Sequence, residues 1–389
     1  MTESLYNTYC VKMDSPEETE FAARTDALLE RRSIDAILAS SYAGTCHLGG
    51  TDFFHLVRPV PEERVYVIWG ADGNRRHLVP DWCAPTAREN ARMEIATWAF
   101  PESPVQALAR NLEAMGLAEA TIGVEMEHLT VAVMDELATL LPELDFVRLD
   151  EDLVLNRVRK RPEEVERMRK ASRAAEIGMA EAIANGEEGM TEKQFSALLK
   201  ESTLRAGADR IDWLALRWID TDQDVLPGDE PIGPGEVISI EMGCSVGGYL
   251  ADVQRTIAVP PAPEDLVIAY RKLSGVHERT MDLLKVGRRY DEVNRLFLED
   301  MAGSGLEMWS QYHLGHSVGI DVHEGFICSE NDTEIVPQSV FAIEPVIETP
   351  TILAIEDIVL VTEDGPEVIS SKGDWTEIPL LGQRIGVPR

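Results

Sequence analysis

Five ionisable residues in the second half of the chain occupy settings that predict burial. Two carboxylates flank a glycine-rich turn, two others stand inside apolar runs typical of β-strands, and a histidine follows a glycine. These residues are Glu241, Asp252, Glu344, Glu356 and His316. A carboxylate among apolar strand residues is destabilising unless a partner compensates its charge. Four such residues in one domain therefore predict a shared compensating partner.

The chemistry of these side chains indicates what that partner is. Mutual burial of four carboxylates requires either proton uptake or bound cations. Carboxylate oxygens with one imidazole suit Mn, Co, Fe or Zn, and four carboxylates are enough to share two ions. Two ions about 3.5 Å apart bridge a hydroxide and polarise a carbonyl group. The residue types thus favour hydrolysis at a centre that contains two divalent metal ions.

A predicted hairpin brings the first two carboxylates together. The segment 234–259 reads PGEVISIEMGCSVGGYLADVQRTIAV, with Gly247-Gly248 at its turn. A two-residue glycine loop is a strong hairpin signal. Trp213 and Trp218 precede this hairpin and could line a pocket, although we expect both to pack in the core.

The remaining predicted elements alternate along two domains. In residues 1–152, strands are expected at 36–39, 65–69 and 121–125, with helices at 17–32 and 104–115, which is typical of an α/β layer. In residues 153–389, helices are expected from Pro162 to Asn185, from Thr191 to Gly207, and at 264–284 and 290–302. Strands are expected at 237–240, 256–259, 340–343 and 355–361. This second domain is therefore predicted to be α+β. The charge run 157–170 is interpreted as a solvated helix start.

Composition excludes several classes of protein. The chain has 389 residues, 44% of them hydrophobic, which is typical of a folded globular protein. A net charge of −33 disfavours nucleic acid and anionic membranes as partners. Five cysteines without a CxxC spacing, and an N-terminus without the pattern of a signal peptide, predict a cytoplasmic protein.

Several motifs, in order over about 200 residues, resemble the pita-bread metallopeptidases: aminopeptidase P, prolidase and their relatives creatinase and ectoine hydrolase. KRPEEVERMRKA resembles the family's KSxxEIxxMRKA, GYLADVQRT resembles GYxxDxTRT, GHSVGIDVHE resembles GHxxGxxxHE, and IEDIVLVTEDG resembles IEDTVLVTEDG. LLERRSIDAILASS and RPVPEE resemble the family's creatinase-like N-terminal domain. The resemblance implies this α/β domain followed by a pita-bread catalytic domain.

Carried over position by position, the resemblance implies roles for individual residues. The five metal ligands fall on Glu241, Asp252, His316, Glu344 and Glu356, with Asp252 and Glu356 bridging the two ions. Glu344 also takes the proton of the attacking water. His323 falls on the histidine that contacts the substrate carbonyl. His313 is expected to support the ligands or the fold, and it is also a candidate contact for the substrate.

The sequence departs from the family at three positions. Glu241 stands where the first ligand is usually aspartate, and Ala354 stands where an arginine is usual. A histidine of the peptidases falls on Asp224, which is a candidate contact for the substrate. Arg58, in the N-terminal domain, is a candidate contact for a substrate carboxylate.

The resemblance predicts a hydrolase of C–N bonds, with an Xaa-Pro peptide as the default substrate and a homodimer as the assembly. Two alternatives remain open at this point. One is a hydrolase or lyase that acts on small non-peptide amides, as creatinase and ectoine hydrolase do. The other is a catalytically silent binding module.

Overall fold

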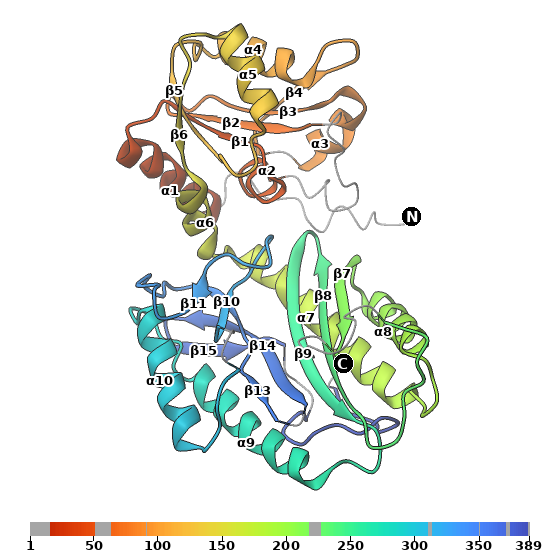
Figure 1. Cartoon of the computed structure of the whole chain (residues 1–389). Coiled ribbons are helices and arrows are strands. Elements are labelled where there is room, and N and C mark those ends of the chain that lie inside the picture. The colour runs from red at the N-terminus through yellow and green to blue at the C-terminus, as the bar shows by residue number, and fades with distance from the viewer. Residues whose placement is uncertain are drawn as a thin grey trace. The chain divides into compact units, whose positions relative to one another are not determined.

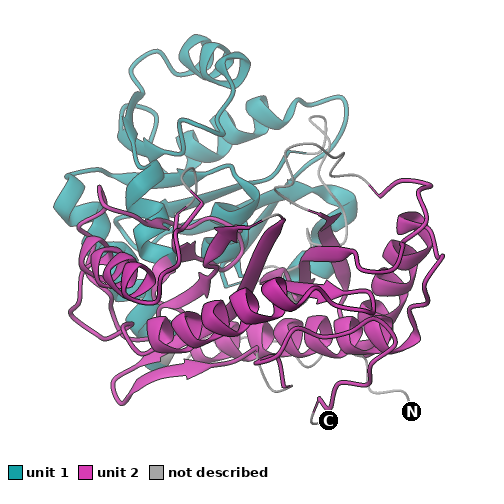
Figure 2. Cartoon of the chain, turned by 60° about the horizontal axis from the view of Figure 1, so that its bottom comes forward, with its two compact units in different colours: residues 1–157 teal, residues 158–389 magenta. Residues whose placement is uncertain are grey.

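The computed structural model describes residues 16–50, 64–90, 92–217, 227–309, 313–349, 351–370 and 374–387. The chain divides into two compact units, residues 1–157 and residues 158–389 (Figure 2). The expected domain boundary after residue 152 falls inside helix α6 (Asp150–Val158) and stays a prediction.

The first unit contains a six-stranded mixed sheet in the order β4-β3-β2-β1-β5-β6 (Figure 1). Strand β1 pairs in antiparallel fashion with β2 and in parallel fashion with β5. The strands are β1 (Ala36–Ala39), β2 (Tyr66–Gly70), β3 (Arg75–Pro80), β4 (Glu94–Trp98), β5 (Thr121–Val124) and β6 (Asp145–Arg148).

Helices cover both faces of this sheet. Strand residues Leu38 and Ile68 form one apolar cluster with α4 (Pro104–Ala114) and α5 (Val131–Leu140). Ile37 and Val67, their neighbours in sequence, join the opposite cluster, because successive strand residues point to opposite faces. The helices of that face are α1 (Pro16–Arg32), α2 (Tyr42–Gly49) and α6, and the short helices η4 (Asp81–Cys83) and α3 (Ala84–Asn90) follow β3. This arrangement confirms the predicted α/β layer.

The second unit is built on a larger sheet with the path β11-β10-β12-β14-β9-β8-β7, and β13 and β15 pair with β14 (Figure 1). All of its strand pairs are antiparallel. The strands are β7 (Arg210–Leu216), β8 (Val237–Val246), β9 (Tyr249–Ala258), β10 (Gly315–Ser317), β11 (Phe326–Ile327), β12 (Val340–Ile343), β13 (Val346–Glu348), β14 (Ile352–Thr362) and β15 (Gly365–Val368).

Four helices accompany this sheet in the described part of the chain. They are α7 (Pro162–Asn185), α8 (Glu192–Ala206), α9 (Glu264–Met281) and α10 (Tyr290–Gly303). Helix α8 begins with a capping box, in which the Thr191 side chain accepts a hydrogen bond from the backbone N–H of Gln194. Gly207 ends it with a φ of 116°, a conformation that glycine adopts without strain. Helix and sheet content confirm the predicted α+β class.

Strand alternation decides which side of β8 is free for chemistry. The Cys244 thiol contacts the backbone oxygen of Ala171 in α7 at 3.3 Å, and Met242 accepts a hydrogen bond from Thr203 in α8. Glu241 and Gly243 therefore face away from these helices. The carboxylates of interest project from the opposite side of the sheet.

Two local expectations were wrong. Glu344 does not lie inside a strand, because it falls between β12 and β13, just before Pro345. The charge run 157–170 is not a solvated helix start, because Arg161, Glu164 and Arg167 are buried. The Glu164 carboxylate accepts hydrogen bonds from Arg161 and from the Tyr249 hydroxyl, which is 2.6 Å away. The hairpin that carries Tyr249 thus covers the start of α7.

Candidate metal centre

Three predicted ligands from three strands meet at one point. Asp252 lies on β9, His316 on β10 and Glu356 on β14, and all three are buried. Each offers one ligand atom within 4.8 Å of the others. Three residues spread over about a hundred positions of the sequence are therefore brought within the span of one metal ion.

Glu344 lies against the same histidine. The Nε2 atom of His316 is 3.4 Å from Oε1 of Glu344 and 3.6 Å from Oδ2 of Asp252. The other ring nitrogen, Nδ1, lies 3.3 Å from the backbone oxygen of Ser317, so we assign the proton of the neutral ring to Nδ1. The Nε2 lone pair then faces two carboxylates, an arrangement that requires a cation or a proton between them.

Glu241 lies on β8, and the register of the β8–β9 hairpin places it beside the other carboxylates. Glu241 pairs with Gln254 on β9, and Gln254 pairs in turn with Glu356 on β14. Asp252 pairs with Gly243, which lies two residues after Glu241 and therefore on the same face of the sheet. Directly paired residues share a face of the sheet, so the three carboxylates converge on one side. Gly247 and Gly248, with φ values of 56° and 81°, form the predicted hairpin turn.

Burial dominates the electrostatics of the cluster. It raises the pKa of Glu241 and Glu356 well above the usual carboxyl range, and the neighbouring Asp252 raises both further. Burial and the negative charge of nearby Glu344 raise the pKa of Asp252 to about 7. Burial and the nearby His323 lower the pKa of His316 to about 3. All four shifts disfavour the charged form, as expected where compensating charge is missing.

The donor atoms fit a divalent cation. Among the described residues, Oε2 of Glu241, Oδ1 of Asp252 and both side-chain oxygens of Glu356 are buried and have no hydrogen-bond partner. Native proteins rarely leave buried polar atoms unsatisfied. Several carboxylate oxygens and one imidazole nitrogen form a ligand set that Mn, Co, Fe or Zn accepts.

Two further histidines and a phenylalanine border the cluster. The Nδ1 atom of His313 is 3.3 Å from Oε1 of Glu344, and burial lowers the pKa of His313 to about 4. The ring of His323 lies 4.5 Å from that of His316, centroid to centroid. Phe326 contacts both outer histidines, with ring-centroid distances of 4.3 Å to His313 and 4.8 Å to His323. Neutral imidazoles thus line one side of the carboxylates.

The structure brings together all the predicted site residues that it describes. These are Glu241, Asp252, His313, His316, His323, Glu344 and Glu356. Asp224, Arg58 and Trp218 lie outside the described residues. Two neighbours were missed: Trp213, whose indole N–H donates to Glu241, and Gln254, which lies between Glu241 and Glu356 in the sheet. No local pattern indicated the contact of Trp213, because this contact depends on the pairing of β7 with β8.

An ion pair supports β14 from the other face of the sheet. Asp357 accepts hydrogen bonds from Arg255 at 2.6 Å and from Ser370 at 2.7 Å. Arg255 also donates to the backbone oxygen of Glu356. The two strands that carry Asp252 and Glu356 are therefore joined by a buried charge pair as well as by their backbone pairing.

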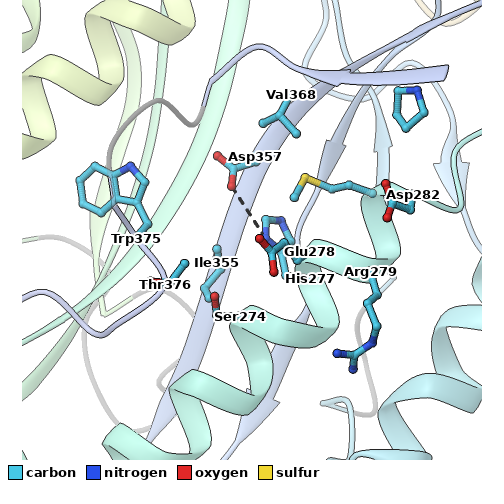
Figure 3. A pocket seen from close by; sticks show the side chains of 12 residues that line it. Ser274, His277, Glu278, Arg279, Asp282, Ile355, Asp357, Val368, Trp375 and Thr376 are labelled. Carbon is cyan, nitrogen blue, oxygen red and sulfur yellow. Dashed lines mark ion pairs between the residues drawn. The ribbon is translucent and has the colours of Figure 1, made fainter. Parts of the chain in front are cut away.

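A pocket of about 520 Å³ lies on that other face (Figure 3). In it, Asp357 faces His277, with 3.8 Å between Oδ2 and Nδ1. Because Glu356 and Asp357 are consecutive in a strand, they point to opposite faces. This pocket is thus separate from the carboxylate cluster. Its lining also includes Ser274, Val368, Trp375 and Thr376.

Among the described residues, no helix has the length and apolarity needed to cross a membrane.

Comparison with known proteins agrees with this site. Residues 166–363 match the family model described as metallopeptidase family M24, and residues 22–160 match the creatinase/prolidase N-terminal domain. An Xaa-Pro dipeptidase from Pyrococcus furiosus is 25% identical over 346 residues, which cover 87% of this chain and 93% of that protein. These matches favour peptide hydrolysis over the small-amide and binding-module alternatives.

Solved structures share the fold. An Xaa-Pro dipeptidase from Bacillus anthracis has a TM-score of 0.80 at 19% identity, over 93% of this chain and 99% of that one. A dipeptidase from Pyrococcus horikoshii has a TM-score of 0.78 at 23% identity, over 90% and 98%. With its matching family model and its buried cluster of acidic and imidazole ligands, the chain belongs to metallopeptidase family M24.

Proposed function

We propose that this protein is an Xaa-Pro peptidase that hydrolyses the bond before proline in short peptides, dipeptides above all. The convergence of Asp252, His316 and Glu356 within 4.8 Å carries this proposal. Membership of the M24 family and the name of the Pyrococcus furiosus relative, Xaa-Pro dipeptidase, support the reaction and the substrate.

In this proposal, two divalent ions would be held by Glu241, Asp252, His316, Glu344 and Glu356, and Asp252 and Glu356 would serve both ions. We favour manganese, and cobalt, iron and zinc suit the same donors. When bound, such ions polarise a carbonyl oxygen and lower the pKa of a coordinated water. The buried site keeps bulk water away from the charges that develop during the reaction.

The chain's own residues then move the protons. Glu344 accepts a proton from the attacking water, and Nδ1 of His313 lies 3.3 Å from Oε1 of this carboxylate. His323 donates a hydrogen bond to the carbonyl oxygen of the scissile bond, where negative charge develops. The C–N bond breaks as the proline nitrogen takes up a proton, which Glu344 returns.

Several finer points belong to the same proposal. A homodimer and a cytoplasmic location are proposed from the resemblance and from the cysteine pattern. The net charge of −33 supports a small-molecule substrate rather than nucleic acid. Asp224 and Arg58 stay predictions for contacts with the substrate.

Release of proline from Gly-Pro, Ala-Pro and Leu-Pro, measured with Mn²⁺ added, tests the function. We expect hydrolysis by the wild-type protein and none by Asp252→Asn. Matched Xaa-Ala dipeptides test whether proline is required. A metal-loaded protein that cleaves no peptide of the panel would contradict the proposal.

A further inference from the structure

Trp213 faces the carboxylate cluster from the edge strand β7. In the β7–β8 pairing, Trp213 lies opposite Gly243, and Ala215 lies opposite Glu241. Directly opposite residues share a face of the sheet, so the indole lies on the same side as Glu241. Its Nε1–H donates a hydrogen bond to Oε1 of Glu241 at 3.1 Å. This is a diagonal contact between neighbouring strands.

Gly243 provides the space for this contact. A Cβ atom at Gly243 would overlap the six-membered ring of Trp213. The indole therefore lies flat over the glycine and reaches the side chain two residues before it. A glycine within a strand is unfavourable unless something approaches closely, and here the approaching group is the indole.

The hydrogen bond from Trp213 makes the two carboxylate oxygens of Glu241 inequivalent. Oε1 accepts the indole hydrogen bond, whereas Oε2 is buried and has no hydrogen-bond partner among the described residues. A glutamate has one more rotatable bond than an aspartate, so a free side chain would lose more entropy when it binds an ion. A partner that fixes the carboxylate before binding removes part of that loss.

We infer that Trp213 is a positioning residue for Glu241, which it holds so that Oε2 is presented beside Asp252 to one of the two metal ions. The inference rests on the proposed metal centre. It adds a hydrogen bond that compensates for the side chain of Glu241, which is longer than the aspartate usual at this position. Trp213 does not touch the substrate in this account, and it acts only through Glu241.

The alternative is that Trp213 merely fills space over Gly243. The variant Trp213→Phe separates the two roles, because phenylalanine keeps an aromatic ring over the glycine but has no N–H donor. If only packing mattered, the variant would bind metal as the wild type does. Loss of a ligand-orienting hydrogen bond typically weakens metal binding by about 10- to 100-fold.

The test is calorimetric titration of metal-free full-length protein with Mn²⁺. We expect Trp213→Phe to weaken one of the two binding events by about tenfold or more. Gly243→Ala, which displaces the indole, should weaken the same event. Trp82→Phe is the matched control, because Trp82 is 53% exposed and belongs to the first unit.

A double-mutant cycle with Glu241→Asp shows whether the effect passes through Glu241. The aspartate carboxylate withdraws by about one C–C bond, roughly 1.5 Å, which takes it out of hydrogen-bonding range of the indole. We therefore expect Trp213→Phe to change Mn²⁺ affinity by less than about twofold in the Glu241→Asp background.

Three results would overturn the inference. One is unchanged affinity and stoichiometry in Trp213→Phe, and another is an equal effect of this substitution in both backgrounds. The third is loss of both binding events together with a lowered melting temperature, which would mean that Trp213 acts through folding. Peptide hydrolysis is not the readout, so a wrong substrate leaves these results valid. A wild-type protein that binds no Mn²⁺ would refute the metal centre and the inference together.

Discussion

Lys160 and Glu324 form a buried ion pair, with 2.6 Å between Nζ and Oε2 and at most 2% of either side chain exposed. Lys160 stands just before α7, and Glu324 directly follows His323. The backbone N–H of Glu324 also bonds to the oxygen of Ser317 at 2.8 Å. The loop that carries His323 is thereby tied to the start of α7.

Removal of one partner should destabilise the second unit strongly. Lys160→Met leaves a buried carboxylate without its cation, which costs about 3–5 kcal/mol. Lys193→Met is the matched control: its partner Asp229 is 80% exposed, so a loss under about 1 kcal/mol is expected. Denaturant unfolding measures both. Equal losses in the two variants would contradict the assigned importance of the buried pair.

Glu344→Gln should lower the rate of Xaa-Pro hydrolysis by at least about 100-fold, because the amide is a poor base and a weaker ligand. Steady-state kinetics with added Mn²⁺ measure the change, and circular dichroism verifies the fold. Turnover equal to that of the wild type would remove Glu344 from the mechanism.

His323→Ala should lower kcat by about 100- to 1,000-fold while the metal content stays at the wild-type level. The reason is that His323 is assigned to the substrate carbonyl and not to an ion. Elemental analysis accompanies the kinetics, and His128→Ala, which removes an exposed imidazole, is the control. If His323→Ala lost its metal, the residue would be a ligand instead.

His77 should make the first unit sensitive to acid. Burial lowers its pKa from 6.5 to about 4. Because the folded-state pKa is the lower one, its contribution to stability is complete above about pH 6.5 and is lost as the pH falls towards 4. The loss amounts to about 3 kcal/mol at most.

Melting temperatures between pH 4 and pH 7.5 measure this dependence. His77→Gln should have a shallower decline below pH 6.5 than the wild type, whatever its absolute stability. His128→Gln serves as the exposed control. Parallel curves for the wild type and His77→Gln would show that His77 does not titrate in this range.

Part of the candidate site could be predicted from the sequence, because three of its motifs are short and lie on strands. Asp252, His316 and Glu356 converge as expected, since antiparallel pairing fixes which strand residues share a face. Trp213 could not be assigned in this way. Its diagonal contact with Glu241 depends on the β7–β8 register, which shifts between Ile211 and Trp213.

The charged residues near position 160 were expected to be solvated but are buried, and the reason is related. A run of charged residues normally predicts solvent exposure, and only partners distant in sequence reverse that expectation. Those partners are Glu324 for Lys160 and Tyr249 for Glu164. Local pattern carries no information about such pairs.

The number of divalent ions bound per chain tests the central claim most directly. Metal-free wild-type protein and Asp252→Asn are dialysed to equilibrium against Mn²⁺, and bound manganese is measured by elemental analysis. We predict two ions per wild-type chain and a clear loss in Asp252→Asn, because Asp252 is assigned to both ions. A wild-type chain that retains no manganese at millimolar concentration, or an Asp252→Asn variant that binds as much as the wild type, would contradict the account.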